Sequence, residues 1–269
     1  MSALMHPLFA LSKRAIKTGV RLAGYEILRR HPVETSLLRR TLREVLDHSK
    51  QRDFSPSTII DVGVGTGTPG LYDVFPQAVL LLVEPLTEFA KEVEDLHRRY
   101  GGHYILAAAG RESGSAVLNV HVDHLEGSSI LREFEGEHVD GSPRQVPVVT
   151  LDEVCAAKEL RGPFVLKVDA QGAELEVLEG AQKVLLGTEL LVLETSLFRF
   201  MRDGPDLYEV LTYMKARGFV VYDIFGGRNR PLDGALAQVD MAFVKEEGIF
   251  HQNRSYATID QRRLMGFRV

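Results

Sequence analysis

The chain predicts an α/β fold with a seven-stranded, mostly parallel sheet, an antiparallel last strand and a helical N-terminal extension. Three observations support this prediction. Short apolar runs alternate with amphipathic stretches of helical length, as in parallel α/β sheets. An acid followed by recurring glycines comes directly after the first apolar run. The last two apolar runs are joined by a loop rich in Gly, Pro and Asn (residues 226–234), which favours an antiparallel hairpin.

The N-terminal extension is expected to contain two helices. Residues 8–30 place apolar side chains on one side and a row of basic side chains beside it. Residues 36–48 repeat leucine and valine at helical spacing. We therefore divide the chain into a helical extension (1–52), a main domain (53–247) and a tail (248–269) for which the sequence predicts no firm structure.

Strands and helices alternate through the main domain. Strands are expected at residues 58–62, 78–83, 103–108, 164–168, 190–193, 219–224 and 238–244. Helices are expected at residues 87–100, 173–186 and 206–217, with another starting at Thr150, whose spacing to Glu153 is that of a capping box. Shorter extended pieces are expected at 116–122 and 145–149. Crossovers between parallel strands are right-handed, which leaves few topologies open.

Composition places the chain among ordinary globular proteins. Its 269 residues are 45% hydrophobic and 26% charged. The single cysteine, Cys155, excludes an internal disulfide and suits a reducing cytosol, so we expect a cytoplasmic protein. We expect no transmembrane helix, because the sequence has no run of about 18 apolar residues. We expect no secretion signal, because Lys13, Arg14 and Lys17 interrupt the first apolar region.

Charge is distributed unevenly along the chain. Residues 1–52 carry eleven Lys and Arg against four acids, a net charge of +7, whereas the whole chain carries −5. The remaining residues therefore carry −12, which argues against a nucleic-acid-binding protein. The basic first helix could contact an anionic membrane surface, so we consider peripheral association with the inner face of a membrane.

The acid and glycines after the first strand predict a nucleoside-cofactor site. Residues 65–70 match the G-x-G-x-x-G pattern of dinucleotide-binding proteins. The longer run from Asp61 through Gly63, Gly65 and Gly67 matches the acid-first loop of enzymes that bind S-adenosylmethionine. An acid placed before the glycines can bind an ammonium group, which NAD lacks, and this favours the second interpretation.

Acids at the ends of four predicted strands extend this site. Asp61, Glu84, Asp169 and Glu194 each follow an apolar run. Because the carboxyl ends of parallel strands open on one edge of a sheet, we expect them to converge there. Glu84 is well placed to accept hydrogen bonds from ribose hydroxyls.

The segment from Val165 to Ala181 makes a family resemblance specific. It has Lys167, Asp169, Gly172, Ala173, Glu174, Leu178, Gly180 and Ala181 in an order that resembles the FkbM family of S-adenosylmethionine-dependent methyltransferases. Supporting matches are Asp61-Val-Gly63, Val83-Glu84-Pro85, Ala107-Ala108, Ser128-Ser129, Val149-Thr-Leu-Asp152, Glu194 and Asp240. The resemblance spans about residues 57–245, and it departs from the family pattern at Gln171, where the family usually has an acid.

The resemblance implies a class I methyltransferase, Rossmann-like fold and methyl transfer to a hydroxyl, often on a sugar of a glycan, glycolipid or secondary metabolite. The cofactor-binding residues would be Asp61 near the methionine amino group, Gly63, Gly65 and Gly67 as a backbone cradle, Glu84 on the ribose, Ala108 near the adenine, and Asp169. Asp169 would be the general base, with Glu194 as its neighbour. This pair could instead hold Mg²⁺.

Two alternatives and several weaker candidates stay open at this point. The chain could be an NAD-dependent oxidoreductase, or a membrane-recruited binding protein that keeps the fold without catalysis, which Gln171 alone supports. His121 and His124 could be bases or metal ligands, although surface histidines are commoner. Ser128 and Ser129 could line an acceptor pocket.

Overall fold

A computed structural model describes residues 38–134 and 139–266. Residues 39–254 form one compact unit. In the separate C-terminal part, a capping box between Thr258 and Gln261 starts a short helix, α9 (Ile259–Leu264). The helix predicted over residues 8–30 lies outside the described residues, so its proposed membrane contact stays a prediction. None of the helices in the described part combines the length and hydropathy needed to span a lipid bilayer.

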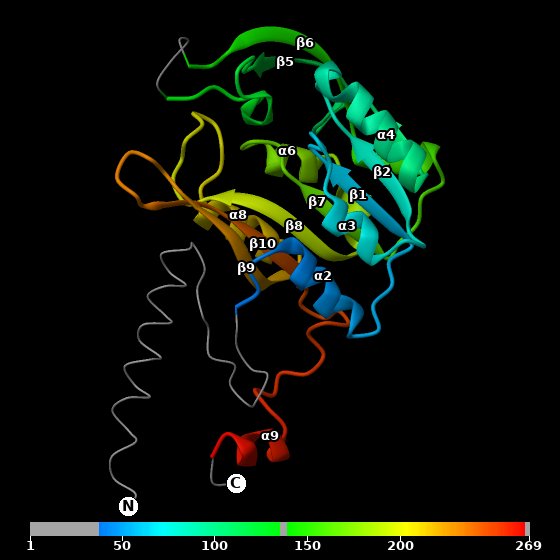
Figure 1. Cartoon of the computed structure of the whole chain (residues 1–269), viewed down its shortest axis with the longest axis vertical. Helices are drawn as coiled ribbons and strands as arrows, with labels where there is room; N and C mark the ends of the chain where they lie inside the picture. Colours follow the sequence, from blue (N-terminus) through cyan, green and yellow to red (C-terminus); the bar gives the residue numbers. More distant parts are fainter. Residues whose placement is uncertain (1–37, 135–138, 267–269) are drawn as a thin grey trace, which may run out of the picture. The chain divides into compact units, whose positions relative to one another are not determined.

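Seven strands in the described part form the predicted mixed sheet (Figure 1). They are β1 (Thr58–Val62), β2 (Val79–Val83), β3 (His103–Ile105), β7 (Phe164–Val168), β8 (Thr188–Ser196), β9 (Phe219–Asn229) and β10 (Leu236–Lys245). Their order is β3-β2-β1-β7-β8-β10-β9. The pairs from β3 to β8 are parallel, and β10 runs antiparallel to both β8 and β9. The predicted antiparallel last strand is therefore confirmed.

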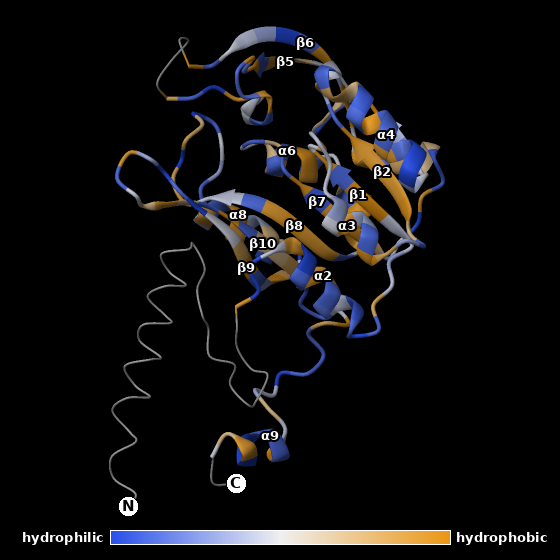
Figure 2. Cartoon of the chain, viewed as in Figure 1, coloured by the Kyte–Doolittle hydropathy of each residue, from blue (hydrophilic) through white to orange (hydrophobic). Residues whose placement is uncertain are grey.

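Helices cover both faces of this sheet and create two hydrophobic clusters. The first cluster joins α2 (Leu42–Lys50), α3 (Pro69–Val74) and α4 (Ala90–Tyr100) to one face, and the second joins α5 (Leu151–Ala157), α6 (Glu174–Glu179), α7 (Gln182–Gly187) and α8 (Leu207–Ala216) to the other. Successive strand residues alternate between them, with Ile59 in the first and Ile60 in the second. Figure 2 shows the resulting apolar character of β2 and β8.

The strand predicted over residues 103–108 is two strands in the structure. Within the main sheet β3 ends at Ile105, opposite Val83, the last residue of β2. Beyond that point β2 offers no further ladder partner, and the chain leaves the sheet. Ala108 and Ala109 form β4, which joins β5 (Gly114–Val120) and β6 (Ser142–Val149) in a separate three-stranded sheet of the described part. Figure 1 shows β5 and β6 beside one another above the main sheet.

Two predicted helices are shorter than expected. The helix predicted over 36–48 begins only at Leu42, because Thr41 and Glu44 form a capping box there. The helix predicted over 173–186 is divided into α6 and α7 near Gly180. A Cβ atom at Gly180 would lie 2.0 Å from the carbonyl oxygen of Gly110, so only glycine allows this close backbone contact.

Gly180→Ala should destabilise the protein by ~1–3 kcal/mol, because the added methyl group forces the backbone of Gly110 to move. Gly114→Ala is the matched control: a Cβ atom there meets nothing within 4 Å. We expect the control to stay within about 0.5 kcal/mol of wild type. Urea unfolding of the three proteins measures both effects, and equal midpoints for the two variants would contradict the packing argument.

Candidate functional site

The main cavity opens where β1, β2 and β7 end, as the convergence of acids predicts. It has a volume of about 240 Å³ and is lined by the loops that follow these strands and by the connection between β5 and β6. Among the predicted cofactor residues, the structure places Gly63, Gly65, Gly67, Glu84, Ala108 and Asp169 in its wall. These positions are far apart in sequence, and the sheet topology brings them together.

The glycine loop forms one wall with bare backbone. Gly63 has φ +73°, and a Cβ atom there would lie 1.9 Å from the carbonyl oxygen of Asp169. The loop after β1 therefore contacts the loop after β7 directly, backbone to backbone. Any side chain at this position would push apart two of the segments that define the cavity.

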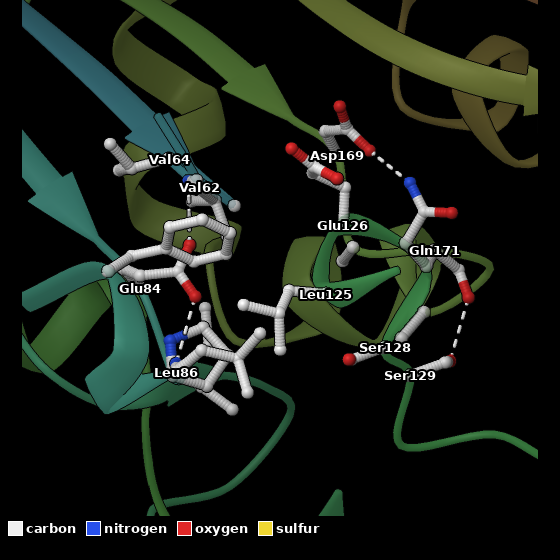
Figure 3. Close-up of a pocket in the computed structure, with 18 of the residues that line it drawn as sticks. Val62, Val64, Glu84, Leu86, Leu125, Glu126, Ser128, Ser129, Asp169 and Gln171 are labelled. Atoms are coloured by element: carbon white, nitrogen blue, oxygen red, sulfur yellow. Dashed lines mark hydrogen bonds between the residues drawn. The ribbon is translucent and has the colours of Figure 1, made fainter. Parts of the chain in front are cut away.

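Glu84 lies at the opposite side of the cavity from Asp169 (Figure 3). Its side chain is buried, with only 3% of the residue exposed. One carboxylate oxygen accepts from the N–H of Gly65 and the other from the N–H of Leu86, both at 2.8 Å. Burial raises the pKa of Glu84, and these two hydrogen bonds oppose the rise. Each oxygen keeps a lone pair that can accept a further hydrogen bond.

The structure does not bring Asp61 to the cavity, which corrects the predicted contact with a methionine amino group. Its carboxylate is fully buried and absent from the cavity wall. It accepts from the Tyr72 hydroxyl and lies 3.3 Å from Lys167 Nζ. The Tyr72 oxygen in turn accepts from the N–H of Thr68 at 3.0 Å. Asp61 therefore supports the end of the glycine loop from beneath, through Tyr72.

Asp169 and Lys167 form the polar part of the wall beside β7. Lys167 Nζ lies 3.6 Å from Asp169 Oδ2 and also pairs with Asp61. Burial alone would lower the pKa of Lys167, but the two carboxylates outweigh this effect and raise it. Lys167 therefore remains an ammonium ion shared between a supporting acid and an acid in the cavity wall.

Glu194 is linked to Asp169 although it does not line the cavity. Gln171 Nε2 donates to Asp169 Oδ1 at 2.7 Å and to Glu194 Oε2 at 3.1 Å. Glu194 is paired across the sheet with Asp240, a second acid on the same face. Burial, followed by the charges of Asp169, Glu174 and Asp240, raises the pKa of Glu194 to about 8. Burial likewise raises the pKa of Asp240 to about 6.

The Mg²⁺ alternative gains no support from this arrangement. Within residues 38–134 and 139–266, no group of three or more His, Cys, Asp or Glu side chains is arranged to hold a metal ion. The amide nitrogen of Gln171 donates to both Asp169 and Glu194. A metal ion shared by these two acids would have to displace this amide.

The weaker candidates differ in whether they line the cavity. Ser128 and Ser129 line the cavity, and their contact with an acceptor stays a prediction. His121 and His124 do not; they lie 3.7 Å from Glu133 and 3.5 Å from Glu126, respectively. Cys155 is buried in the second hydrophobic cluster, and burial raises the pKa of its thiol to about 12, which makes it a core residue.

Two residues of the site were not assigned a role from the sequence. Gln171, noted as a departure from the family pattern and as the sole support for a non-catalytic protein, connects the two acids. Glu174 is buried and accepts from the N–H groups of Ala170 and Gly172, each at 3.0 Å, so it fixes the loop that carries Gln171. A signal existed in the sequence, because the N–H groups of a turn that contains glycine need an acceptor and a nearby acid can supply it.

Glu194→Gln should flatten the dependence of stability on pH. The pKa of Glu194 in the fold lies above its ordinary value, so its contribution is complete at low pH and is lost as pH rises through about 8. The variant should therefore melt higher than wild type near pH ~9 and about equally near pH ~4.5. Calorimetry at both pH values measures this, and a difference of the same size at each would refute the electrostatic assignment.

Comparisons with solved structures return distant methyltransferases. The precorrin-6y C5,15-methyltransferase from Geobacter metallireducens is 12% identical, with 76% of this chain and 87% of that chain covered and a TM-score of 0.39. The 1,6-didemethyltoxoflavin-N1-methyltransferase from Burkholderia thailandensis is also 12% identical, with 91% and 92% covered and a TM-score of 0.39. Similarity at this level indicates no substrate. No curated protein matches the chain.

The comparison with protein families identifies the family of this chain, which the distant solved structures do not. Residues 61–221, more than half of the chain, match the family described as the methyltransferase FkbM domain. The match spans the glycine loop, Glu84, the loop after β7 and Glu194. The match includes residues 65–70, which fit the G-x-G-x-x-G pattern, and it assigns them to a methyltransferase. The NAD-dependent alternative is therefore wrong. The chain belongs to the FkbM family of S-adenosylmethionine-dependent methyltransferases.

Proposed function

We propose that this protein transfers a methyl group from S-adenosylmethionine to a hydroxyl group, and that the acceptor is a sugar of a glycan, glycolipid or secondary metabolite. The observation that carries the proposal is the position of Asp169. Its carboxylate lies in the wall of the same cavity as Glu84 and the glycine loop, so a proton acceptor and a nucleoside-binding acid share one space. The sugar class rests on the resemblance to the family.

The residues present fit the cofactor. The lone pairs left on Glu84 suit two ribose hydroxyls, and the bare backbone at Gly63 leaves room for the ligand to approach the chain. Ala108 and Leu86 supply apolar surface for the adenine. These residues, together with Gly65, Gly67 and Asp169, would hold it.

The chemistry divides simply between cofactor and protein. When bound, the cofactor supplies a methyl group already activated by the sulfonium. The protein aligns the acceptor, an effect worth up to ~7–11 kcal/mol of the barrier. Asp169 takes the proton of the acceptor hydroxyl, and Ser128 and Ser129 lie where they can contact the acceptor. Glu194, joined to Asp169 through Gln171, is the neighbouring acid of the base.

Glu84→Ala should weaken binding of S-adenosylhomocysteine by about 100-fold or more, because hydrogen bonds to a charged group are worth ~1.5–3 kcal/mol each. Glu84→Gln keeps one acceptor oxygen and should lose less. Isothermal titration calorimetry measures both, with circular dichroism to confirm folding. Unchanged affinity in the alanine variant would remove the ribose assignment.

Asp169→Asn should lower kcat by about 10²–10⁴-fold, since it removes the proton acceptor while keeping the size of the side chain. Affinity for S-adenosylhomocysteine should fall far less than kcat, because the glycine loop and Glu84 are untouched and only the contact from Asp169 changes. The assay follows transfer of a labelled methyl group to a panel of methyl glycosides. Full activity of the variant would refute Asp169 as the base; cofactor binding without transfer to any acceptor would favour the non-catalytic alternative.

A further inference from the structure

Gln171 joins the two acids that are candidates for catalysis. Its Nε2 atom donates to Asp169 Oδ1 at 2.7 Å and to Glu194 Oε2 at 3.1 Å. A glutamine amide has two N–H donors, and this arrangement uses one on each carboxylate. Figure 3 shows the amide directed toward Asp169. Because the amide is neutral, it connects two carboxylates without adding a charge of either sign.

The backbone around Gln171 is held in an uncommon conformation. Gln171 has φ +49°, in the left-handed region that residues other than glycine seldom occupy. Glu174 accepts from the N–H groups on either side of it, at Ala170 and Gly172. The Ser129 hydroxyl donates to the Gln171 carbonyl oxygen at 2.7 Å. Strained residues of this kind concentrate at functional sites, and here the strained residue is the one whose side chain connects the acids.

Charged groups from several elements surround the bridged pair. Lys167 on β7 lies 3.6 Å from Asp169. The charges of Glu174 on α6 and Asp240 on β10 raise the pKa of Glu194, and the charge of Arg228 on β9 lowers it. With Asp169 and Glu194 themselves included, this set holds four acids and two cations, so the bridged acids repel each other whenever both are ionised, and a shared donor opposes their separation.

Gln238 provides an internal comparison. Its Nε2 atom donates to the same Glu194 oxygen as Gln171, also at 3.1 Å. It lies on β10 and reaches only one of the two acids. Removing Gln238 or Gln171 therefore costs Glu194 one hydrogen bond in each case, but removing Gln171 also releases Asp169.

We propose that Gln171 is a positioning residue whose amide holds Asp169 and Glu194 together and turns Asp169 toward the acceptor. The role of this bridge in catalysis rests on the proposed function, which takes Asp169 as the general base. With Oδ1 bound by the amide, Oδ2 of Asp169, which lies 3.6 Å from Lys167 Nζ, keeps a lone pair for the hydroxyl proton. Without the amide, Asp169 keeps its pairing with Lys167 but loses the hydrogen bond that fixes its orientation toward the acceptor.

The first experiment measures whether Gln171 contacts both acids. Gln171→Met keeps the length of the side chain and removes both donors, and Gln238→Met is the matched control. The whole chain is labelled with ¹³C at the carboxyl groups of Asp and Glu, and NMR follows the resonance of each acid as pH changes. The variants Asp169→Asn and Glu194→Gln assign the two resonances. Both methionine variants should raise the pKa of Glu194 above about 8, since each removes a hydrogen bond to its charged form. Only Gln171→Met should change the chemical shift of the Asp169 carboxyl carbon.

The second test separates positioning from binding. Gln171→Met should lower kcat by about tenfold or more with KM within about threefold, and Gln238→Met should lower it less. If Gln171→Met does not fold, Gln171→Glu replaces it; the added like charge should raise the pKa of Glu194 further.

An Asp169 resonance that is unchanged by Gln171→Met, or changed equally by Gln238→Met, overturns the bridge even if methyl transfer is intact. Failure of the wild-type protein to bind S-adenosylhomocysteine would instead refute the proposed function, and the NMR comparison would still decide the bridge.

Discussion

The pairing of Lys167 with Asp61 and Asp169 is the interaction on which the rest of the site depends. Asp61 and Lys167 are register partners on adjacent strands β1 and β7, so their side chains leave the sheet on the same face. Burying either charge alone would be costly, and the pair makes both tolerable. Through Tyr72, Asp61 also reaches the backbone of Thr68. One ammonium ion thus connects the glycine loop to the loop that carries Asp169.

This connection explains why a buried acid outside the cavity wall matters to the cavity. The glycine loop and the loop after β7 meet through backbone contact at Gly63, which leaves no room for adjustment by side chains. Their relative position is set by the ladder between β1 and β7, which continues in the hydrogen bond from the Asp169 N–H to the Val62 carbonyl oxygen, and by the charges beneath them. Glu84 completes the arrangement by binding the glycine loop at Gly65 from the other side.

The acids at the other side of the cavity are arranged by a different principle. Asp169 follows β7, while Glu194 and Asp240 are paired within β8 and β10, and few cations neutralise the three acids. Burial, and then the repulsion between acids, raises the pKa of Glu194 to about 8 and that of Asp240 to about 6, so Glu194 holds a proton at neutral pH. A group poised near neutrality is suited to proton transfer. The neutral amide of Gln171 lets these acids stay close without an additional ion.

The sequence by itself determined the sheet, the antiparallel last strand and the convergence of Glu84, Asp169 and the glycines, because periodicity and strand-end positions are local signals. It also determined the family, through the order of residues from Asp61 to Asp240. Only the tertiary structure decided that Asp61 supports the loop instead of lining the cavity, that strand 103–108 divides at Ile105, and that Gln171 joins two acids. These outcomes depend on which face a side chain leaves and on what lies across from it, and both are set by pairing between segments distant in the chain.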